Sequence, residues 1–89
     1  MTRDDLRSAV IDALLSVAPE ADPARLKPDV SLRDQLDLDS MDLLNFIIAL
    51  HRALQVDIPE ADYRRLMALD GCVTYLEEKL GSTPAGGGR

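Results

Sequence analysis

Apolar residues recur with helical spacing from the start of the chain. They follow an i, i+3, i+4, i+7, i+8, i+11 pattern, which places them on one face of a helix from about Thr2 to Val17: Leu6, Ala9, Val10, Ala13, Leu14 and Val17. Thr2 and Asp5 have the spacing of a capping box. Pro19 is expected to end this helix, because proline lacks an amide hydrogen and restricts the preceding residue.

A long connection, residues 18–39, is predicted to follow. Asp22-Pro23 is expected to start one helical turn and the segment 31–35 another. Spaced apolar side chains can attach the connection to the core: Leu26, Val30, Leu32, Leu36 and Leu38. Loops this long are uncommon in small domains unless they have a function. The segment either joins two helices or positions the residue that follows it, and both interpretations stay open.

The next helix is predicted from Ser40 to Leu54 or Gln55, and it carries two apolar stripes. The first is expected in the core: Leu43, Phe46, Ile47, Leu50 and Leu54. The second lies roughly 130° away on the helical wheel: Met41, Leu44 and Ile48. A surface helix needs only one buried stripe, and so small a domain has few elements to cover the other. We therefore predict that the second stripe is partly exposed and available to a partner.

Two further helices are predicted. Pro59, Glu60 and Asp62 favour the start of a short third helix, whose inward face is formed by Tyr63, Leu66 and Met67. Asp70 is predicted to cap a fourth helix with Val73, Leu76 and Leu80 at helical spacing, and Gly81 to end it. The segment 82–89 contains Pro84 and three consecutive glycines and is expected to be a disordered tail.

No segment alternates with period two for long enough to predict a strand. The chain is therefore expected to be all-α, with three longer helices, one short third helix and a long loop between the first two. At 89 residues it has room for one core, so residues 1–81 are predicted to form one domain.

The amino-acid composition excludes several classes of function and of site. The 16 acidic residues exceed the 10 basic ones, for a net charge of −6, and no basic cluster interrupts this balance. Such a chain repels nucleic acids and anionic lipids. A single cysteine, Cys72, excludes an internal disulfide and a multi-cysteine metal site. The first residues lack the apolar run of a signal peptide or a membrane span, so a cytoplasmic location is predicted.

Asp37, Asp39 and Asp42 surround Ser40, which suggests a metal site or a reactive serine. A calcium loop would also need a central glycine, a continued alternation of ligands and a terminal glutamate. This pattern is broken by Leu36, Leu38, Met41 and Leu43. The one histidine, His51, is three helical turns from Ser40 and cannot act as its base, so it is interpreted as a solvated helix residue. Cys72 is interpreted as a packing residue. We therefore predict neither a metal site nor an enzyme.

Ser40 is expected in the first turn of its helix. Free backbone amides and the helix dipole favour a phosphate attached there. A simple helix-capping role for Asp39 or Ser40 is the alternative.

The segment Leu36-Asp37-Leu38-Asp39-Ser40-Met41-Asp42, followed by an apolar helix and Val56-Asp57-Ile58-Pro59, resembles the acyl carrier protein family. Asp39-Ser40-Met41 matches the family core, and the resemblance covers about residues 2–80. It implies a four-helix bundle with a 4′-phosphopantetheine arm that a separate transferase moves from coenzyme A to Ser40. The terminal thiol of the arm would then carry an acyl or aminoacyl group as a thioester.

The resemblance also implies partner-facing residues. Asp39 would assist recognition by the transferase or its metal. Partners would read a docking face formed by Met41, Leu44 and Ile48, together with Asp42. Those partners would be a loading ligase and downstream acyl-processing enzymes, acting on a monomeric carrier. Some family members shelter the acyl chain in the core, at positions matched here by Leu43, Phe46, Ile47, Leu50 and Leu54.

The chain departs from the family pattern in two places. Asp37 occupies a position where the family often has glycine, so the resemblance does not define the loop conformation there. Asn45, His51 and Arg52 replace glutamates that fatty-acid carriers usually display on this helix. A specialised carrier is therefore predicted. The alternatives are a small helical adaptor that binds a partner helix, with Ser40 only a cap, and a calcium sensor at residues 37–42.

The clustered acids generate a prediction about stability. Asp37, Asp39, Asp42, Asp57, Glu60 and Asp62 should repel one another at low ionic strength, so added salt or divalent cations should raise the melting temperature. Thermal denaturation across a salt series measures this. An unchanged or lower melting temperature contradicts the argument.

Overall fold

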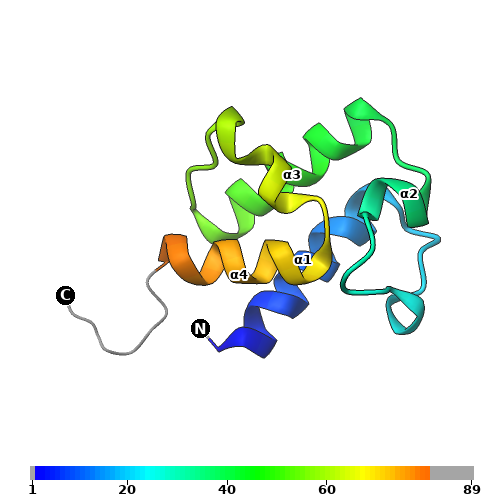
Figure 1. Cartoon of the computed structure of the whole chain (residues 1–89), viewed down its shortest axis with the longest axis horizontal. Coiled ribbons are helices and arrows are strands. Elements are labelled where there is room, and N and C mark those ends of the chain that lie inside the picture. The colour runs from blue at the N-terminus through cyan, green and yellow to red at the C-terminus, as the bar shows by residue number, and fades with distance from the viewer. Residues whose placement is uncertain (1, 81–89) are drawn as a thin grey trace.

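The computed structural model describes residues 2–80, which form helices and turns without a strand (Figure 1). The elements in chain order are α1 (Arg3–Val17), the 3₁₀ helix η1 (Pro23–Arg25), α2 (Leu32–Leu36), α3 (Ser40–Leu54), the 3₁₀ helix η2 (Glu60–Leu66) and α4 (Leu69–Leu80). The predicted all-α fold is confirmed, with three longer helices and a short one before α4. The two short helical turns expected in the long connection are η1 and α2.

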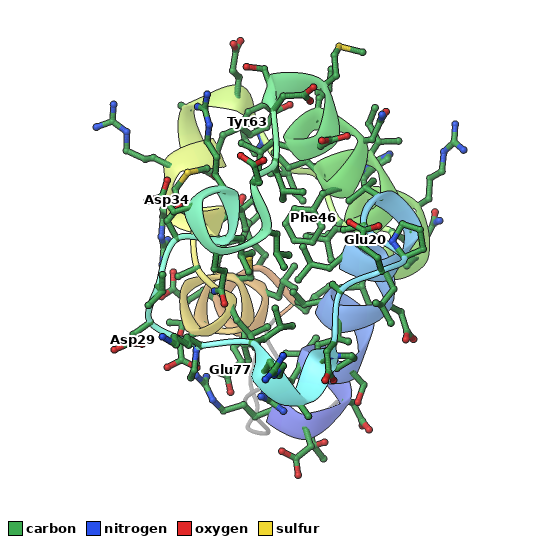
Figure 2. All side chains as sticks on the ribbon, turned by 90° about the vertical axis from the view of Figure 1, so that its right-hand side faces the viewer. Glu20, Asp29, Asp34, Phe46, Tyr63 and Glu77 are labelled. Atoms are coloured by element: carbon green, nitrogen blue, oxygen red, sulfur yellow. The ribbon has the colours of Figure 1, made fainter. Side chains whose placement is uncertain are left out.

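Helix α1 packs against both α3 and α4, and α4 also packs against η2. Figure 1 shows the long connection passing around one end of these helices, on the right, and returning to the start of α3. Figure 2 places Phe46 in the middle of the side chains and Asp29 at the left-hand edge. The buried residues form one apolar cluster, so the described residues share a single core.

Helix boundaries follow the local capping signals closely. The Thr2 hydroxyl accepts a hydrogen bond from the Asp5 amide at 3.1 Å, and the Asp5 carboxylate accepts one from the Thr2 amide at 3.1 Å. The predicted capping box is therefore confirmed. Asp22 and Ser31 cap η1 and α2 through their side-chain oxygens, without the reciprocal hydrogen bond of a capping box.

Helix α3 exposes one apolar stripe and buries the other. Phe46, Ile47 and Leu50 are buried, and Leu43 and Leu54 pack against them while remaining half-buried. The second stripe stays accessible, with relative exposures of 62% for Met41, 39% for Leu44 and 38% for Ile48. This partial exposure was predicted from helical spacing and is confirmed.

Helix α4 begins before the residue predicted to cap it. The Cys72 amide donates to the Ala68 carbonyl at 2.9 Å, so the helix starts at Leu69 and Asp70 lies in its first turn. The Asp70 amide donates instead to the Pro28 carbonyl in the long connection, at 3.0 Å. The prediction that Asp70 is the N-cap is therefore wrong. A distant backbone carbonyl satisfies the amide, which a local sequence signal could not indicate.

A polar cluster joins η2 to α4. The hydroxyl of the buried Tyr75 donates to the Asp62 carboxylate at 2.7 Å. The pKa of Tyr75 is raised to about 12, mainly by burial and secondly by this hydrogen bond. Arg65 lies over the Tyr75 ring and pairs with Glu78 at 2.8 Å. Gly71 permits this close packing, because a Cβ there would lie 2.8 Å from the Arg65 carbonyl oxygen.

Three expectations concern residues outside this description. The structure does not describe residues 81–89. This segment contains the predicted helix stop at Gly81, the predicted tail 82–89 and the predicted domain boundary at residue 81. Among residues 2–80, none of the helices combines the length and apolar character needed to cross a membrane.

Candidate functional site

Ser40 is the first residue of α3, and its side chain is exposed. The preceding residue, Asp39, is the N-cap, and Leu38 before it is buried. The chain therefore anchors an apolar side chain in the core two residues before it presents the serine hydroxyl to solvent. The predicted position of Ser40, in the first turn of a helix, is confirmed.

Asp39 and Asp42 form a reciprocal capping box around Ser40. The Asp39 Oδ1 atom accepts from the Asp42 amide at 2.8 Å, and the Asp42 Oδ2 atom accepts from the Asp39 amide at 3.2 Å. Each carboxylate thus satisfies a backbone donor at the helix start, and an N-cap aspartate typically contributes about 1 kcal/mol. The two acids fix the geometry of the turn that holds Ser40.

Asp37 adopts a left-handed backbone conformation, with φ 55° and ψ 46°. It ends α2, and the Leu38 amide then donates to the Arg33 carbonyl at 3.0 Å, which is the hydrogen bond of a Schellman motif. Glycine adopts this conformation without steric cost, whereas aspartate is one of the few other residues that tolerate it. The structure therefore accounts for a glycine preference at this position and for the acceptability of Asp37.

The side chain of Gln35 fastens the long connection next to this turn. Its Nε2 atom donates to the carbonyls of Lys27 and Val30, at 2.9 and 3.0 Å, and its Oε1 atom accepts from the Lys27 amide at 2.9 Å. The Leu32 amide donates to the Met67 carbonyl at 2.7 Å, which attaches the same segment to the end of η2. The last part of the connection is therefore attached both to the earlier part of the connection and to the end of η2. These attachments favour the interpretation that the connection positions Ser40.

The start of α3 has the chemistry to accept a phosphate group. The capping box uses the Asp42 amide, and the Leu43 amide donates to the Asp39 carbonyl at 3.1 Å. Within residues 2–80, the Ser40 and Met41 amides have no protein acceptor. Free amides at a positive helix end favour an anion, so a phosphate on the exposed Ser40 hydroxyl fits this structure.

The other candidate groups have structural partners. The His51 Nδ1 atom lies 2.7 Å from the Val56 carbonyl, so it carries the proton and the ring fastens the turn after α3. His51 is exposed, as predicted for a solvated helix residue, and this contact adds a structural role that the sequence did not indicate. The Cys72 thiol is buried, which raises its pKa to about 12, and it donates to the Leu66 carbonyl, as expected for a packing residue.

The three acids near Ser40 do not form a ligand set. Asp39 and Asp42 direct carboxylate oxygens to backbone amides, and Asp37 lies beyond them on the turn after α2. In the part of the chain that the structure describes, no three histidine, cysteine or acidic side chains are grouped to hold a metal ion.

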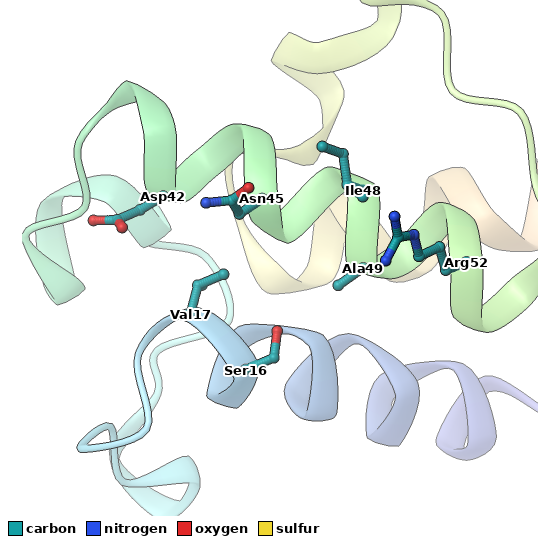
Figure 3. A pocket seen from close by; sticks show the side chains of 7 residues that line it. All are labelled: Ser16, Val17, Asp42, Asn45, Ile48, Ala49 and Arg52. Atoms are coloured by element: carbon teal, nitrogen blue, oxygen red, sulfur yellow. The ribbon is translucent and has the colours of Figure 1, made fainter.

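A surface groove of about 500 Å³ adjoins the exposed stripe of α3. Helix α1 supplies one wall through Ser16 and Val17, as Figure 3 shows. Helix α3 supplies the other through Asp42, Asn45, Ile48, Ala49 and Arg52. Ile48 belongs to both features, so the apolar stripe continues into a hollow with polar edges. Helical spacing within α3 could not reveal the wall that α1 contributes.

Comparison with known proteins agrees with this geometry. Residues 8–69 match the protein family described as a phosphopantetheine attachment site. The acyl carrier protein of Campylobacter curvus is 35% identical over 78 residues, which cover 88% of this chain and 94% of that protein. The acyl carrier protein of Campylobacter concisus is 30% identical over the same coverage. That of Bdellovibrio bacteriovorus is 31% identical over 58 residues, 65% of this chain and 74% of that protein.

The left-handed conformation of Asp37 generates a test of the turn before Ser40. Asp37→Gly should stabilise the fold by about 0.5–1 kcal/mol, because the steric cost of a left-handed side chain exceeds the added entropy of the unfolded chain. Asp37→Ala is the matched control and should destabilise it. Urea denaturation measures both. A glycine variant less stable than the native chain contradicts the assigned conformation.

Proposed function

The chain belongs to the acyl carrier protein family, whose members are non-enzymatic carriers with a phosphopantetheine attachment site, and from this premise we propose that Ser40 is the attachment residue. The observation that carries the proposal is the exposed Ser40 hydroxyl beside two unpaired amides at the start of a 15-residue helix. The matched region, residues 8–69, contains this position.

The proposed attachment assigns distinct tasks to the residues of the turn. Ser40 Oγ attacks the phosphorus atom that carries pantetheine in coenzyme A and forms a phosphodiester bond with it. The pyrophosphate bond of coenzyme A breaks, and adenosine 3′,5′-bisphosphate leaves. The transferase must supply the base that removes the hydroxyl proton, because His51 is 11 residues farther along α3, or about 16 Å. Once attached, the arm offers a thiol that holds acyl groups as thioesters. The Ser40 and Met41 amides then stabilise its phosphate charge.

Asp39 has two proposed roles. Its Oδ1 atom caps α3, which keeps Ser40 in the first turn. Its charge, on an exposed side chain, is also proposed to be recognised by the phosphopantetheinyl transferase or by the metal ion of that enzyme. The two roles can be separated, because an asparagine caps a helix about as well as an aspartate but carries no charge.

The exposed stripe of α3 is the proposed docking face for the transferase, the loading ligase and downstream acyl-processing enzymes. Met41, Leu44 and Ile48 provide apolar contact area on a rigid helix that starts at Ser40. Asp42 lines the adjoining groove at the end nearest Ser40. Contiguous apolar side chains that remain exposed in a small domain commonly mark a binding surface.

We further propose that the carrier serves a specialised pathway rather than housekeeping fatty-acid synthesis. Asn45, His51 and Arg52 occupy exposed positions of α3 where fatty-acid carriers usually present glutamates. A basic enzyme surface would find no acid at these positions. Action as a monomer in the cytoplasm remains a prediction from the sequence.

A small helical adaptor is the competing function. It would use the same stripe to bind a partner helix, and Asp39 would only cap α3 around an unmodified Ser40. The match of residues 8–69, which include Ser40, to a phosphopantetheine attachment site favours the carrier, whereas free amides occur at every helix start and do not separate the two functions. Partner binding that is independent of Ser40 would favour the adaptor.

The first prediction of the proposal concerns the site of modification. Incubation of the purified chain with coenzyme A and a broad-specificity transferase should add one phosphopantetheinyl group, measured by intact mass. Ser40→Ala should abolish the gain, whereas Ser8→Ala, which removes an exposed hydroxyl from α1, should leave it unchanged. No mass gain in the native chain, or a gain that survives Ser40→Ala, contradicts the assignment.

The second prediction separates the capping role of Asp39 from its charge. Asp39→Asn should retain the hydrogen bond to the Asp42 amide and hence the melting temperature. Its rate of phosphopantetheinylation should fall by about tenfold or more, the loss expected from one charged contact. Asp39→Ala should lower both quantities. If Asp39→Asn is modified at the native rate, the charge of Asp39 has no part in recognition.

A further inference from the structure

The charge on the exposed face of α3 is opposite to that of the chain as a whole. The chain has a net charge of −6, yet α3 contains one acid, Asp42, and this residue is half-buried in its capping box. The exposed positions beyond the first turn are apolar, neutral or basic: Leu44, Asn45, Ile48, His51, Arg52 and Ala53.

Arg52 is the main charge on this face. It lies on the same side of α3 as Ile48 and Met41, since the three are separated by four and seven residues. Two arginines make ion pairs, Arg3 with Glu77 and Arg65 with Glu78, whereas Arg52 shares the lack of one to any described residue with Arg7, Arg25, Arg33 and Arg64. Among residues 2–80, no carboxylate oxygen lies within the 4.0 Å of an ion pair with Arg52. Its guanidinium is therefore available to a partner.

A second donor lines the same groove two helical turns before Arg52. Figure 3 shows Asn45 and Arg52 on the α3 wall above Ser16 of α1. The Ser16 hydroxyl donates to the Ala13 carbonyl at 2.6 Å, and one oxygen of the Asp42 carboxylate accepts the Asp39 amide. The free donors of the groove are therefore the Asn45 amide and the Arg52 guanidinium, which lie two helical turns apart on α3, and the guanidinium is the one suited to a carboxylate.

We propose that the docking face accepts a partner-enzyme surface in which apolar side chains are edged by carboxylates. The apolar part covers Met41, Leu44 and Ile48, a carboxylate reaches Arg52 at the far end of the groove, and a second acceptor reaches the Asn45 amide two helical turns before it. This inference rests on the proposed carrier function and specifies the chemistry of its partner. It also gives the chain two recognition regions of opposite charge, acidic around Ser40 and basic at the far end of α3.

Stabilisation of the helix is the simpler explanation for Arg52. A cation in the last turn interacts favourably with the helix dipole. That effect explains a positive charge near Leu54, but it does not explain why the exposed face lacks acids or why Asn45 and Arg52 border one groove. The test must therefore compare binding between variants that are folded.

The test uses two synthetic helical peptides of about 15 residues, a length that can form a helix. They share a leucine stripe and differ only in its flanking residues, which are all glutamate or all lysine. Each peptide is titrated into the full-length phosphopantetheinylated chain, and amide NMR signals report the binding site. The same titrations are made with Arg52→Glu and with Arg7→Glu, a matched charge reversal at an exposed position of α1. Circular dichroism confirms that each variant is folded.

The glutamate peptide should shift the Asn45, Ile48 and Arg52 signals and bind this face about threefold or more tightly than the lysine peptide, the ratio expected for exposed charge pairs. Arg52→Glu should reverse that preference, and Arg7→Glu should not. The inference is overturned if the lysine peptide binds the face equally or more tightly, if neither peptide shifts these signals, or if both variants behave alike. Failure of the carrier function itself would appear separately, as absence of the phosphopantetheinyl mass gain on Ser40.

Discussion

The backbone reversal between α2 and α3 is the constraint on which the rest of the site depends. Three residues separate the two helices, and each has a distinct task. Asp37 turns the chain through a left-handed conformation, Leu38 anchors it in the core, and Asp39 starts the next helix. Ser40 can occupy the exposed first position of α3 only because these three conditions hold together. The acids that first suggest a metal or catalytic site therefore serve the geometry of the turn.

Contacts between distant segments support this reversal. The Gln35 side chain holds the carbonyls of Lys27 and Val30, and backbone hydrogen bonds attach Leu32 to Met67 and Asp70 to Pro28. A backbone that is fixed in this way loses little further entropy when a partner binds. A long connection that is fixed to η2 and α4 thus presents Ser40 as part of a rigid body. The length of the connection is consistent with a positioning function for this segment.

Local signals in the sequence predicted much of this arrangement. The capping box at Thr2 and the two stripes of α3 depend on residues within a few positions of each other, so the sequence pattern predicted them. At the start of α3 the sequence indicated only a cap at Asp39 or Ser40, and the structure shows a reciprocal box between Asp39 and Asp42. Asp70 was assigned incorrectly because its amide partner, the Pro28 carbonyl, is distant in sequence. Three other features were not predicted, because each depends on segments that only the fold brings together. They are the contacts of Gln35, the hydrogen bond between Tyr75 and Asp62, and the groove beside Arg52. The conformation of Asp37 was left open, because its side chain alone does not define a left-handed backbone.

The central claim is that this turn exists to present Ser40 for modification. The most direct test is fragmentation mass spectrometry of the chain purified from the cells that produce it. The account predicts a phosphopantetheinyl group on Ser40, with the mass of any thioester-bound cargo added to the same residue. An unmodified chain, or the group on another serine such as Ser16 or Ser31, would contradict the account.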